Sequence, residues 1–352
     1  MEATEAFLKD LVEAHGAPGF ESDVAAVMKR YLEGVGEVSR DRLGSFVCEK
    51  KGGAGPKVML AGHLDEVGFM VKSVTKEGFV KFLGLGGWWG HVVLGQRLII
   101  KTRKGDVIGV VGSKPPHELK DEDRKKVLEL REMYIDVGAT SDWDVRKKLD
   151  IRPGDAILPD SKYTVMANPN LMLAKAWDNR IGCALAAVTA KRLEDVKHPN
   201  TVFAVATVQE EVGLRGAVTS AFKVQPDVGF ALDVGIAHDT PGTEGEEKLG
   251  GGPLVVIYDA TSIPNRGLLD LVTDTAAKLK IPLQFESVER GGTDAGRIHL
   301  TGQGVPCISM GVPARYIHSH SSIIDRRDFD RTVDLLVGLV KRLDSKTVAA
   351  LT

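Results

Sequence analysis

The chain has few cysteines, few aromatic residues and almost no net charge. Its 352 residues include 3 cysteines and 6% aromatic residues, and 46 basic residues nearly balance 48 acidic ones for a net charge of −2. Cys48, Cys183 and Cys307 stand singly in apolar segments without a C-x-x-C spacing, which predicts core packing as their role. The near-neutral charge gives no electrostatic case for a nucleic-acid or membrane partner, and we expect neither.

Long hydrophobic runs are also lacking. No apolar stretch reaches about 18 residues, which argues against a transmembrane helix. The first segment, MEATEAFLKDLVEAHG, is charged and amphipathic and has neither the basic start nor the apolar run of a secretory signal. We therefore expect a cytoplasmic protein. Its hydrophobic content of 43% and charged content of 27% are typical of a soluble globular chain, and its length predicts about two domains.

The pattern along the chain predicts an α/β fold that is interrupted once. Amphipathic helices and an apolar strand ending at His63 come first, and from 67 to 167 only short β-type runs follow, separated by glycine or charge. One helical stretch, the charged segment 114–131, is expected among them. From Asp178 the α/β pattern returns. We therefore expect a discontinuous α/β domain, residues 1–67 and 168–352, with a small all-β domain, residues 68–167, inserted into it.

Acids and histidines follow several of the predicted buried strands. The candidates are His63, Asp65, Asp178, Glu210, Glu211, Asp233 and His318. In open α/β sheets, ligands and catalytic groups gather outside the carboxyl ends of the strands, so these residues could share one crevice although they lie far apart in the chain. Imidazole and carboxylate groups together indicate a metal site with hydrolytic chemistry.

Some of these residues also have simpler interpretations. Asp178 could be a helix N-cap, and Glu210 with Glu211 could be a charged turn. Asp233 ends a buried strand, where an ionised carboxylate needs a cation or good hydrogen bonds. His318 and His320 cannot be told apart by spacing. The other histidines considered, His91, His117, His238 and His299, lack such a setting and are treated as background.

Six segments in chain order resemble the motifs of the tetrahedral (TET) aminopeptidases, which are dinuclear metallopeptidases of the glutamyl and leucyl aminopeptidase type, some of them labelled endoglucanase. They are GHLDEVG at 62–68, WDNR at 177–180, QEEVG at 209–213, ALD at 231–233, GGTDA at 291–295 and RYIHS at 315–319. The resemblance covers nearly the whole chain. It implies a mixed-sheet metallopeptidase domain sandwiched by helices, an inserted PDZ-like domain that mediates dimer contacts, and assembly of dimers into a dodecamer.

The resemblance also implies a role for each candidate. His63, Asp178 and Asp233 would hold one divalent ion, and Asp178, Glu211 and His318 the other, with Asp178 as the bridge. Glu210 would be the general base and Asp65 would orient His63. The comparison thereby selects His318 over His320.

The residue chemistry agrees with an aminopeptidase acting on short peptides. Two ions can share a water and lower its pKa, Glu210 can carry its proton to the leaving amine, and one ion can bind the free α-amine of the substrate. The ligand set suits zinc or cobalt, and also manganese. We expect neutral aliphatic N-terminal residues such as leucine, with Arg215, Asp294 and Arg315 as polar lining of the substrate pocket.

Three other functions explain the same candidate residues less completely. A metal-dependent deacylase or carboxypeptidase would need nearly the same site. A glycoside hydrolase would need two carboxylates and no metal, which leaves His63 and His318 unexplained. A non-catalytic scaffold would be expected to lack the base or a ligand, and all of them are present.

Overall fold

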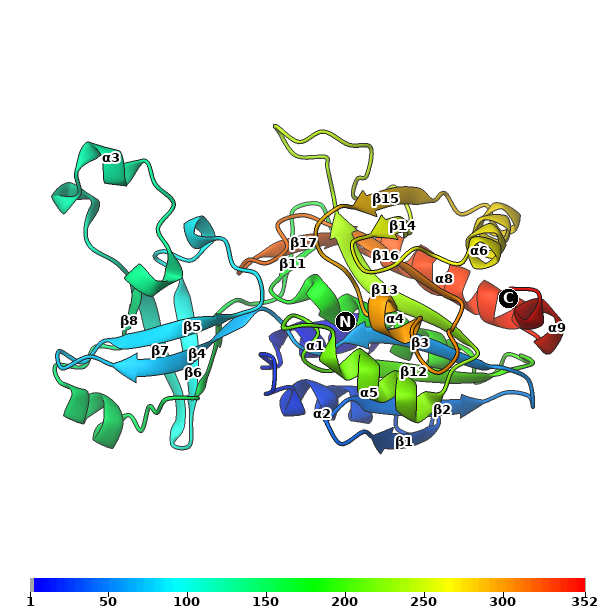
Figure 1. Cartoon of the computed structure of the whole chain (residues 1–352), viewed down its shortest axis with the longest axis horizontal. Coiled ribbons are helices and arrows are strands. Elements are labelled where there is room, and N and C mark those ends of the chain that lie inside the picture. Colours follow the sequence, from blue (N-terminus) through cyan, green and yellow to red (C-terminus); the bar gives the residue numbers. More distant parts are fainter. Residues whose placement is uncertain (1–2, 352) are drawn as a thin grey trace.

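The computed structural model describes residues 3–351 and shows an elongated molecule made of two parts (Figure 1). The larger part is an α/β body that carries both ends of the described chain. The smaller part is a β-barrel, drawn in cyan and green, that projects from one side of the body. The chain leaves the body after β3 and returns through the strands that precede α4, so the barrel is an insertion in the α/β pattern, as the sequence predicts.

The body is built on a mixed eight-stranded sheet with the order β1-β2-β12-β3-β13-β16-β14-β15. The four central strands β12, β3, β13 and β16 run parallel to one another, so their carboxyl ends meet at the same edge. These central strands are apolar and buried over most of their length, as expected of strands covered on both faces. The strands are β1 (Glu37–Arg40), β2 (Phe46–Lys51), β3 (Lys57–His63), β12 (Thr201–Thr207), β13 (Val228–Ile236), β14 (Leu254–Asp259), β15 (Gln284–Val288) and β16 (Cys307–Ala314).

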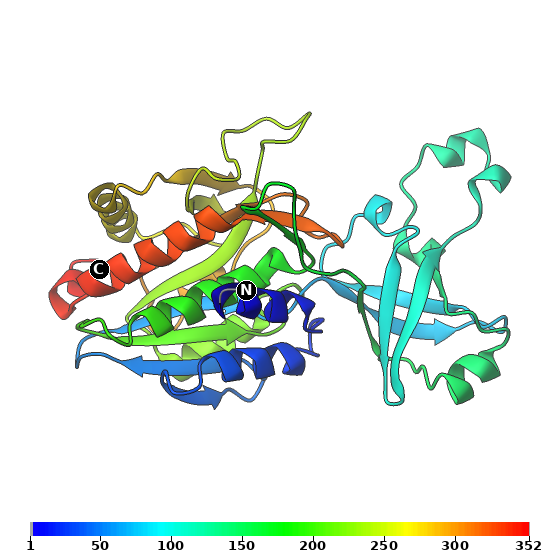
Figure 2. The same ribbon diagram turned by 180° about the vertical axis from the view of Figure 1, so that it is seen from behind.

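Helices cover both faces of this sheet, which confirms the predicted sandwich. One hydrophobic core joins the sheet to α1, α2, α4, α6 and α8, and a smaller one joins the opposite face to α5 and α7. Figure 2 shows α1, α4 and α8 lying across the first face. The helices are α1 (Ala3–Glu13), α2 (Ser22–Tyr31), α4 (Trp177–Arg192), α5 (Arg215–Val224), α6 (Arg266–Leu279), α7 (Ala295–Ile298), α8 (Arg326–Arg342) and α9 (Ser345–Ala349).

The barrel is closed and consists of the six β-type runs that the sequence predicts. Its strands are β4 (Gly68–Val74), β5 (Val80–Leu85), β6 (Arg97–Thr102), β7 (Gly105–Gly112), β8 (Tyr134–Asp136) and β9 (Ala156–Pro159), arranged in the order β4-β5-β8-β7-β6-β9. Closure removes the exposed strand edges of a small sheet. The entering and leaving strands are neighbours, since Phe69 of β4 pairs with Ile157 of β9. The barrel has its own hydrophobic core, which includes Phe69, Phe82 and Ile135.

The charged segment 114–131 is less helical than the sequence indicates. It contains one short α-helix, α3 (Asp121–Arg124), and 3-10 turns at Pro116–Glu118 and Leu130–Glu132. None of the residues of α3 is buried, so packing does not stabilise a longer helix there. A three-stranded sheet of β10 (Thr164–Val165), β11 (Leu171–Ala174) and β17 (Ser322–Asp325) lies near the return to the body. The exact division at residues 67/68 and 167/168 stays a prediction.

Candidate metal centre and active site

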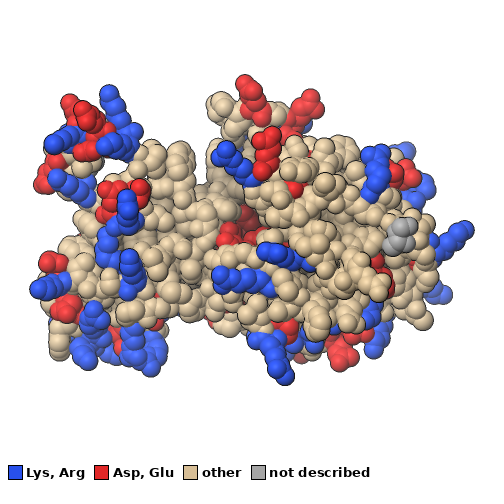
Figure 3. All heavy atoms as spheres, viewed as in Figure 1, with Lys and Arg blue, Asp and Glu red and all other residues tan. Residues whose placement is uncertain are grey.

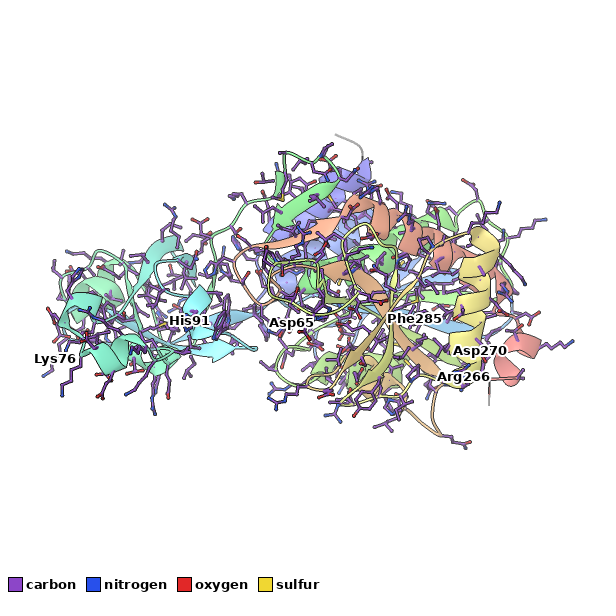
Figure 4. All side chains as sticks on the ribbon, turned by 90° about the horizontal axis from the view of Figure 1, so that it is seen from above. Asp65, Lys76, His91, Arg266, Asp270 and Phe285 are labelled. Atoms are coloured by element: carbon purple, nitrogen blue, oxygen red, sulfur yellow. The ribbon has the colours of Figure 1, made fainter. Side chains whose placement is uncertain are left out.

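The predicted site residues come together at the carboxyl edge of the four parallel strands. His63 is the last residue of β3, Glu210 and Glu211 follow β12, Asp233 lies near the end of β13, and His318 follows β16. Figure 4 places Asp65 on the side of the body that faces the barrel, while Arg266 and Asp270 lie on α6 at the far side. In Figure 3 acidic side chains are visible inside a hollow near the middle of the molecule.

The first turn of α4 is held so that Asp178 faces this edge. The indole of Trp177 donates to the carbonyl of Met172 (3.1 Å), and the amide of Asn179 donates to the carbonyl of Leu232 (2.8 Å). The N-cap position of α4 is Ala176, and Asp178 lies inside the first turn with non-helical dihedral angles. The N-cap interpretation is therefore not the one that the structure shows.

Two glycines allow α4 to approach the sheet closely. A Cβ atom on Gly62 of β3 would lie 2.4 Å from the backbone of Gly182, and one on Gly182 would lie 2.0 Å from the carbonyl oxygen of Leu232. Any larger residue would push the helix away from β3 and β13. The distance between Asp178 and the strand-borne residues thus depends on these glycines.

Asp178 lies between the two histidines. Its Oδ1 atom is 3.2 Å from Nε2 of His63, and its Oδ2 atom is 3.2 Å from Nε2 of His318. The two oxygens of one carboxylate therefore face two imidazoles, one from the end of β3 and one from the loop after β16. This is the arrangement expected of a carboxylate that bridges two metal ions.

Further carboxylates surround each histidine. Nε2 of His63 is 3.6 Å from Glu210 and 4.0 Å from Asp233, and Nε2 of His318 is 3.6 Å from Glu211. Two groups have ligand atoms within 4.8 Å of one another, and both could hold a metal ion. They are His63 with Glu210 and Asp233, and His63 with Asp178 and Glu211.

Asp65 has a different set of contacts from the one expected. Nδ1 of His63 is 3.0 Å from the backbone oxygen of Asp65, whereas the carboxylate of Asp65 is farther from this atom, at 3.6 Å. That carboxylate accepts hydrogen bonds from the backbone N–H groups of Glu210 and Glu211, both at 3.0 Å. Asp65 therefore fixes the turn that carries the two glutamates as well as the orientation of His63.

The barrel contributes its backbone to the site. The loop after β5 places the carbonyl oxygen of Gly87 2.7 Å from Nδ1 of His318, which leaves Nε2 directed toward Asp178. A Cβ atom on the preceding residue, Gly86, would lie 3.0 Å from a carboxylate oxygen of Glu211. Both glycines keep space for residues of the body.

Burial and crowding shift the pKa values of the carboxyl groups upward. Burial raises the pKa of Glu211 to about 8, with a further contribution from the negative charge of Asp178. The pKa values of Glu210 and Asp233 are also raised well above the ordinary range, mainly by burial. Carboxylates with this behaviour are held close together in a low-dielectric site and favour a cation among them.

The same carboxylates raise the pKa values of the two histidines. Burial opposes the charge of His63, but the nearby carboxylates, Glu210 first, raise its pKa well above the ordinary value. The pKa of His318 is raised to about 10, because Asp178 and Glu211 outweigh burial. Asp178 is the exception among the acids, since its hydrogen bonds to both histidines hold its pKa below the usual range in spite of burial.

The donor set fits divalent metal ions. All the groups are imidazole nitrogens or carboxylate oxygens, which suit zinc, cobalt and manganese. Oε1 of Glu211 is buried without a hydrogen-bond partner among the described residues, as expected of a metal ligand. His318 has a positive φ of 54° and Gln209, next to Glu210, one of 56°, and such backbone strain of about 1 to 3 kcal/mol is concentrated at functional sites.

The site opens into a cavity of about 390 Å³. It is lined by His63, Asp178, Glu210, Glu211, Asp233 and His318, by Gly87, and by residues of the β13, β14 and β15 ends and of the 290–293 loop. Gly87 is not predicted from the sequence, because it acts through its backbone. Glu286, which lines this cavity from β15, is not predicted either.

The three residues expected as polar lining are not among the lining residues of this cavity. Arg215 is exposed and donates to Gln209. Asp294 is buried and accepts a hydrogen bond from Thr207 (2.5 Å). Arg315 forms a two-pronged ion pair with Asp239, with both distances 2.7 Å. Their role as substrate contacts stays a prediction.

The fold and the site together define a metal-dependent hydrolase, with histidines and carboxylates gathered at the edge of an α/β sheet. The M42 glutamyl aminopeptidase family matches residues 44–335, and the chain belongs to this family. It is a metallo-aminopeptidase. The predicted relationship to the TET aminopeptidases is thereby confirmed.

Curated relatives match over nearly their full length. The chain is 39% identical to the putative aminopeptidase FrvX of Escherichia coli K12, over 97% of this chain and 96% of the relative. It is 37% identical to the glutamyl aminopeptidase of Lactococcus lactis (97% of both chains) and 33% identical to the lysyl aminopeptidase of Pyrococcus furiosus (96% of both chains). The last two relatives are named for residues of opposite charge, so membership of the family does not define the preferred substrate.

Solved structures show the same fold throughout. The TET aminopeptidase of the marine sediment archaeon Thaumarchaeota archaeon SCGC AB-539-E09 superposes with a TM-score of 0.98 at 44% identity, over 100% of both chains. The TET1 peptidase of Pyrococcus horikoshii, described as assembling into a tetrahedron or a large octahedral shell, has a TM-score of 0.86 at 28% identity, over 97% of this chain and 100% of that one. Within residues 3–351, none of the helices is long and apolar enough to span a membrane.

Proposed function

We propose that the protein removes N-terminal residues from short peptides with two divalent ions per subunit, held by His63, Asp178, Glu211, Asp233 and His318. The observation that carries the proposal is the position of Asp178, with one oxygen 3.2 Å from each histidine. When bound, two ions supply Lewis acidity and lower the pKa of a water. Zinc and cobalt are the proposed metals, with manganese as a third.

Glu210 is the proposed general base. We assign the other three carboxylates and the two histidines as ligands, so that each ion has one imidazole and two carboxylates with Asp178 shared. Glu210 is close enough to His63 and Asp233 to be a ligand, and we assign it instead as the group that transfers the proton. Its raised pKa, caused mainly by burial, suits a group that takes a proton from the attacking water and returns it to the leaving amine. The hydrogen bond from its backbone N–H to Asp65 holds it in place.

The sequence predicts that the enzyme prefers substrates whose N-terminal residue is neutral and aliphatic. The cavity walls support an aliphatic chain, since Ile236, Val256 and Val288 all line the cavity. Beyond these residues, the carboxyl group of Glu286 also lines the cavity.

Self-association through the barrel is also part of the proposal, with a dodecamer built from dimers as the expected form. The barrel exposes large apolar side chains, which are typical of an interface. They are Leu83, Trp89, Leu94, Ile108, Val110, Val127 and Trp143. Size-exclusion chromatography with light scattering on the wild type and on Ile108→Lys tests this: an unchanged mass in the variant argues against this strand as part of the interface.

The catalytic proposal is tested with aminoacyl p-nitroanilides and their N-acetylated forms. The chelated enzyme is given zinc, cobalt or manganese in turn. Metal-restored cleavage of the free-amine substrates alone is the expected result. Cleavage of the acetylated substrates would favour a deacylase instead, and activity that does not depend on metal would contradict the proposed centre.

A further inference from the structure

The cavity has a second polar feature, away from the two histidines. Glu286 of β15 lines the cavity and is only 4% exposed. Its Oε1 atom accepts a hydrogen bond from the backbone N–H of Ile236 (3.0 Å). Its Oε2 atom is buried and has no hydrogen-bond partner among residues 3–351. A buried carboxylate with one unsatisfied oxygen is costly unless a ligand completes it.

A neighbouring acid shows that this is not a general property of the cavity wall. Asp259 also lines the cavity, but its carboxylate accepts hydrogen bonds from Thr261, Ser262 and Thr293. Both of its oxygens are used within the protein. Glu286 is the acid of this wall that keeps an oxygen for a ligand.

The position of Glu286 relative to the proposed metal centre is set by β13. Asp233 and Gly235 are two residues apart on this strand, so they face the same side of the sheet, roughly 6 to 7 Å apart. A Cβ atom on Gly235 would lie 2.1 Å from Oε2 of Glu286, so the carboxylate lies directly over this glycine. The free oxygen is therefore about one extended side chain away from Asp233.

The space between these two points suits an aliphatic stem. Ile236, Val256 and Val288 line the cavity together with Glu286. A lysine side chain has four methylene groups and extends roughly 6 Å from its Cα atom to its ammonium group. Such a chain, with its backbone at the metal centre, would lie against apolar walls and end at the carboxylate.

Arg290 is the competing feature, because it also lines the cavity and would attract an acidic side chain. It is exposed, so water and salt screen its charge. Glu286 is buried, where a charge pair is screened much less. The pKa of Glu286 is raised, mainly by burial; the negative charge of Glu247 adds to this rise and His238 opposes it.

We propose that this cavity is the pocket for the N-terminal side chain of the substrate and that Glu286 selects cationic residues, lysine and arginine. The proposal rests on the aminopeptidase function proposed above. The aliphatic walls of the pocket are those expected for leucine, but the far end of the pocket carries the charge of Glu286.

The test compares lysine and norleucine p-nitroanilides, which differ only in the terminal ammonium group. In the metal-loaded wild type, kcat/KM for lysine should exceed that for norleucine by at least about tenfold, since a hydrogen bond to a charged group is involved. In Glu286→Gln the ratio should fall to about one, with norleucine cleavage retained. Glu289→Gln is the matched control, because Glu289 is exposed on the same segment and should leave the ratio unchanged.

Glutamine keeps the size of Glu286 and the acceptor for Ile236, and circular dichroism with metal analysis confirms that the variant is folded and loaded. A wild type that cleaves norleucine as well as lysine, or that prefers glutamate, overturns the proposal. An unchanged ratio in Glu286→Gln overturns it as well, as does cleavage of other free-amine substrates with no action on lysine. Failure of every free-amine substrate would instead contradict the aminopeptidase function.

Discussion

The Nδ1 atom of His318 lies 2.7 Å from the carbonyl oxygen of Gly87. One residue belongs to the α/β body and the other to the barrel insertion, so the backbone of the insertion orients a proposed metal ligand. Such hydrogen bonds to the second nitrogen of a ligating histidine fix its tautomer and direction. The barrel is therefore part of the active site as well as a candidate surface for assembly.

Gly87→Val should weaken metal binding. A Cβ atom at this position would lie 3.1 Å from Nδ1 of His318, and the two methyl groups beyond it would displace the ring. We expect metal affinity to fall about 10- to 100-fold, as for other losses of a partner of a ligating histidine. Metal content per subunit after dialysis measures this. Lys76→Ala, at an exposed barrel turn, is the control, and full metal content in Gly87→Val would contradict the prediction.

Glu210→Gln should remove turnover and keep the metal centre. A general base typically contributes about 10²- to 10⁴-fold to the rate, and the amide cannot take the proton. We expect kcat to fall by at least about 100-fold while metal content and molecular mass match the wild type. If kcat is unchanged, Glu210 is not the base; if metal is lost, Glu210 is a ligand.

Asp65→Asn tests the turn that carries the two glutamates. The carboxylate accepts from the N–H groups of both Glu210 and Glu211, and an amide would present a donor to one of them. We expect kcat to fall at least about tenfold with a KM close to that of the wild type, because the base is displaced while the pocket around Glu286 is intact. A change confined to KM would show that Asp65 acts on substrate binding instead.

Glu66→Gln should destabilise the body. The carboxylate accepts from Lys175 (2.5 Å) and Arg180 (3.0 Å), and all three side chains are at most 2% exposed. Removing the acid leaves two buried cations, which we expect to cost about 3 kcal/mol of unfolding free energy. Asp270→Asn, in the exposed ion pair with Arg266 on α6, should change the free energy by less than about 1 kcal/mol. Urea denaturation of both variants gives the comparison, and equal effects would contradict it.

The low pKa of Lys175 should make the free energy of unfolding increase with pH in alkaline solution. Burial lowers its pKa to about 8 from the ordinary 10.5, although Glu66 opposes the drop. Between about pH 8 and 10.5 the unfolded chain therefore binds a proton that the folded chain has released, so unfolding takes up a proton and its free energy increases with pH. The difference in unfolding free energy between the wild type and Lys175→Met should increase across this window. A constant difference from pH 7 to 10 would refute the assignment.

Much of the fold and of the site could be predicted from the sequence, because both depend on local patterns. The six short β runs of the barrel and the buried strands of the body are set by alternation and apolar runs. His63, Glu210 and Asp233 come together because parallel strands end at one edge. Asp178 required the resemblance to known motifs, since a helix N-cap explains the sequence around it equally well.

The features that could not be predicted depend on contacts between distant backbones. Gly87 acts through its carbonyl oxygen, which every residue has, so no side chain marks it. In the sequence, Glu286 is one polar residue of an edge strand, and nothing marks that the space for its carboxylate depends on the missing side chain of Gly235. Arg315 resembles a substrate contact in sequence, but the acid that pairs with it, Asp239, is 76 residues away.

The path of the chain through the barrel also bears on folding. His63 and Asp178 are 115 positions apart, and a contact between them in an unstructured chain closes a very long loop. Because β4 and β9 are paired neighbours, a folded barrel holds Phe69 beside Ile157, leaving only 6 and 21 positions on the two sides. Each halving of a flexible loop lowers its closure entropy by about 0.6 kcal/mol, so prior folding of the barrel lowers the cost by about 1 kcal/mol. The folded insertion thus lowers the entropic cost of bringing together the two halves of the proposed metal centre.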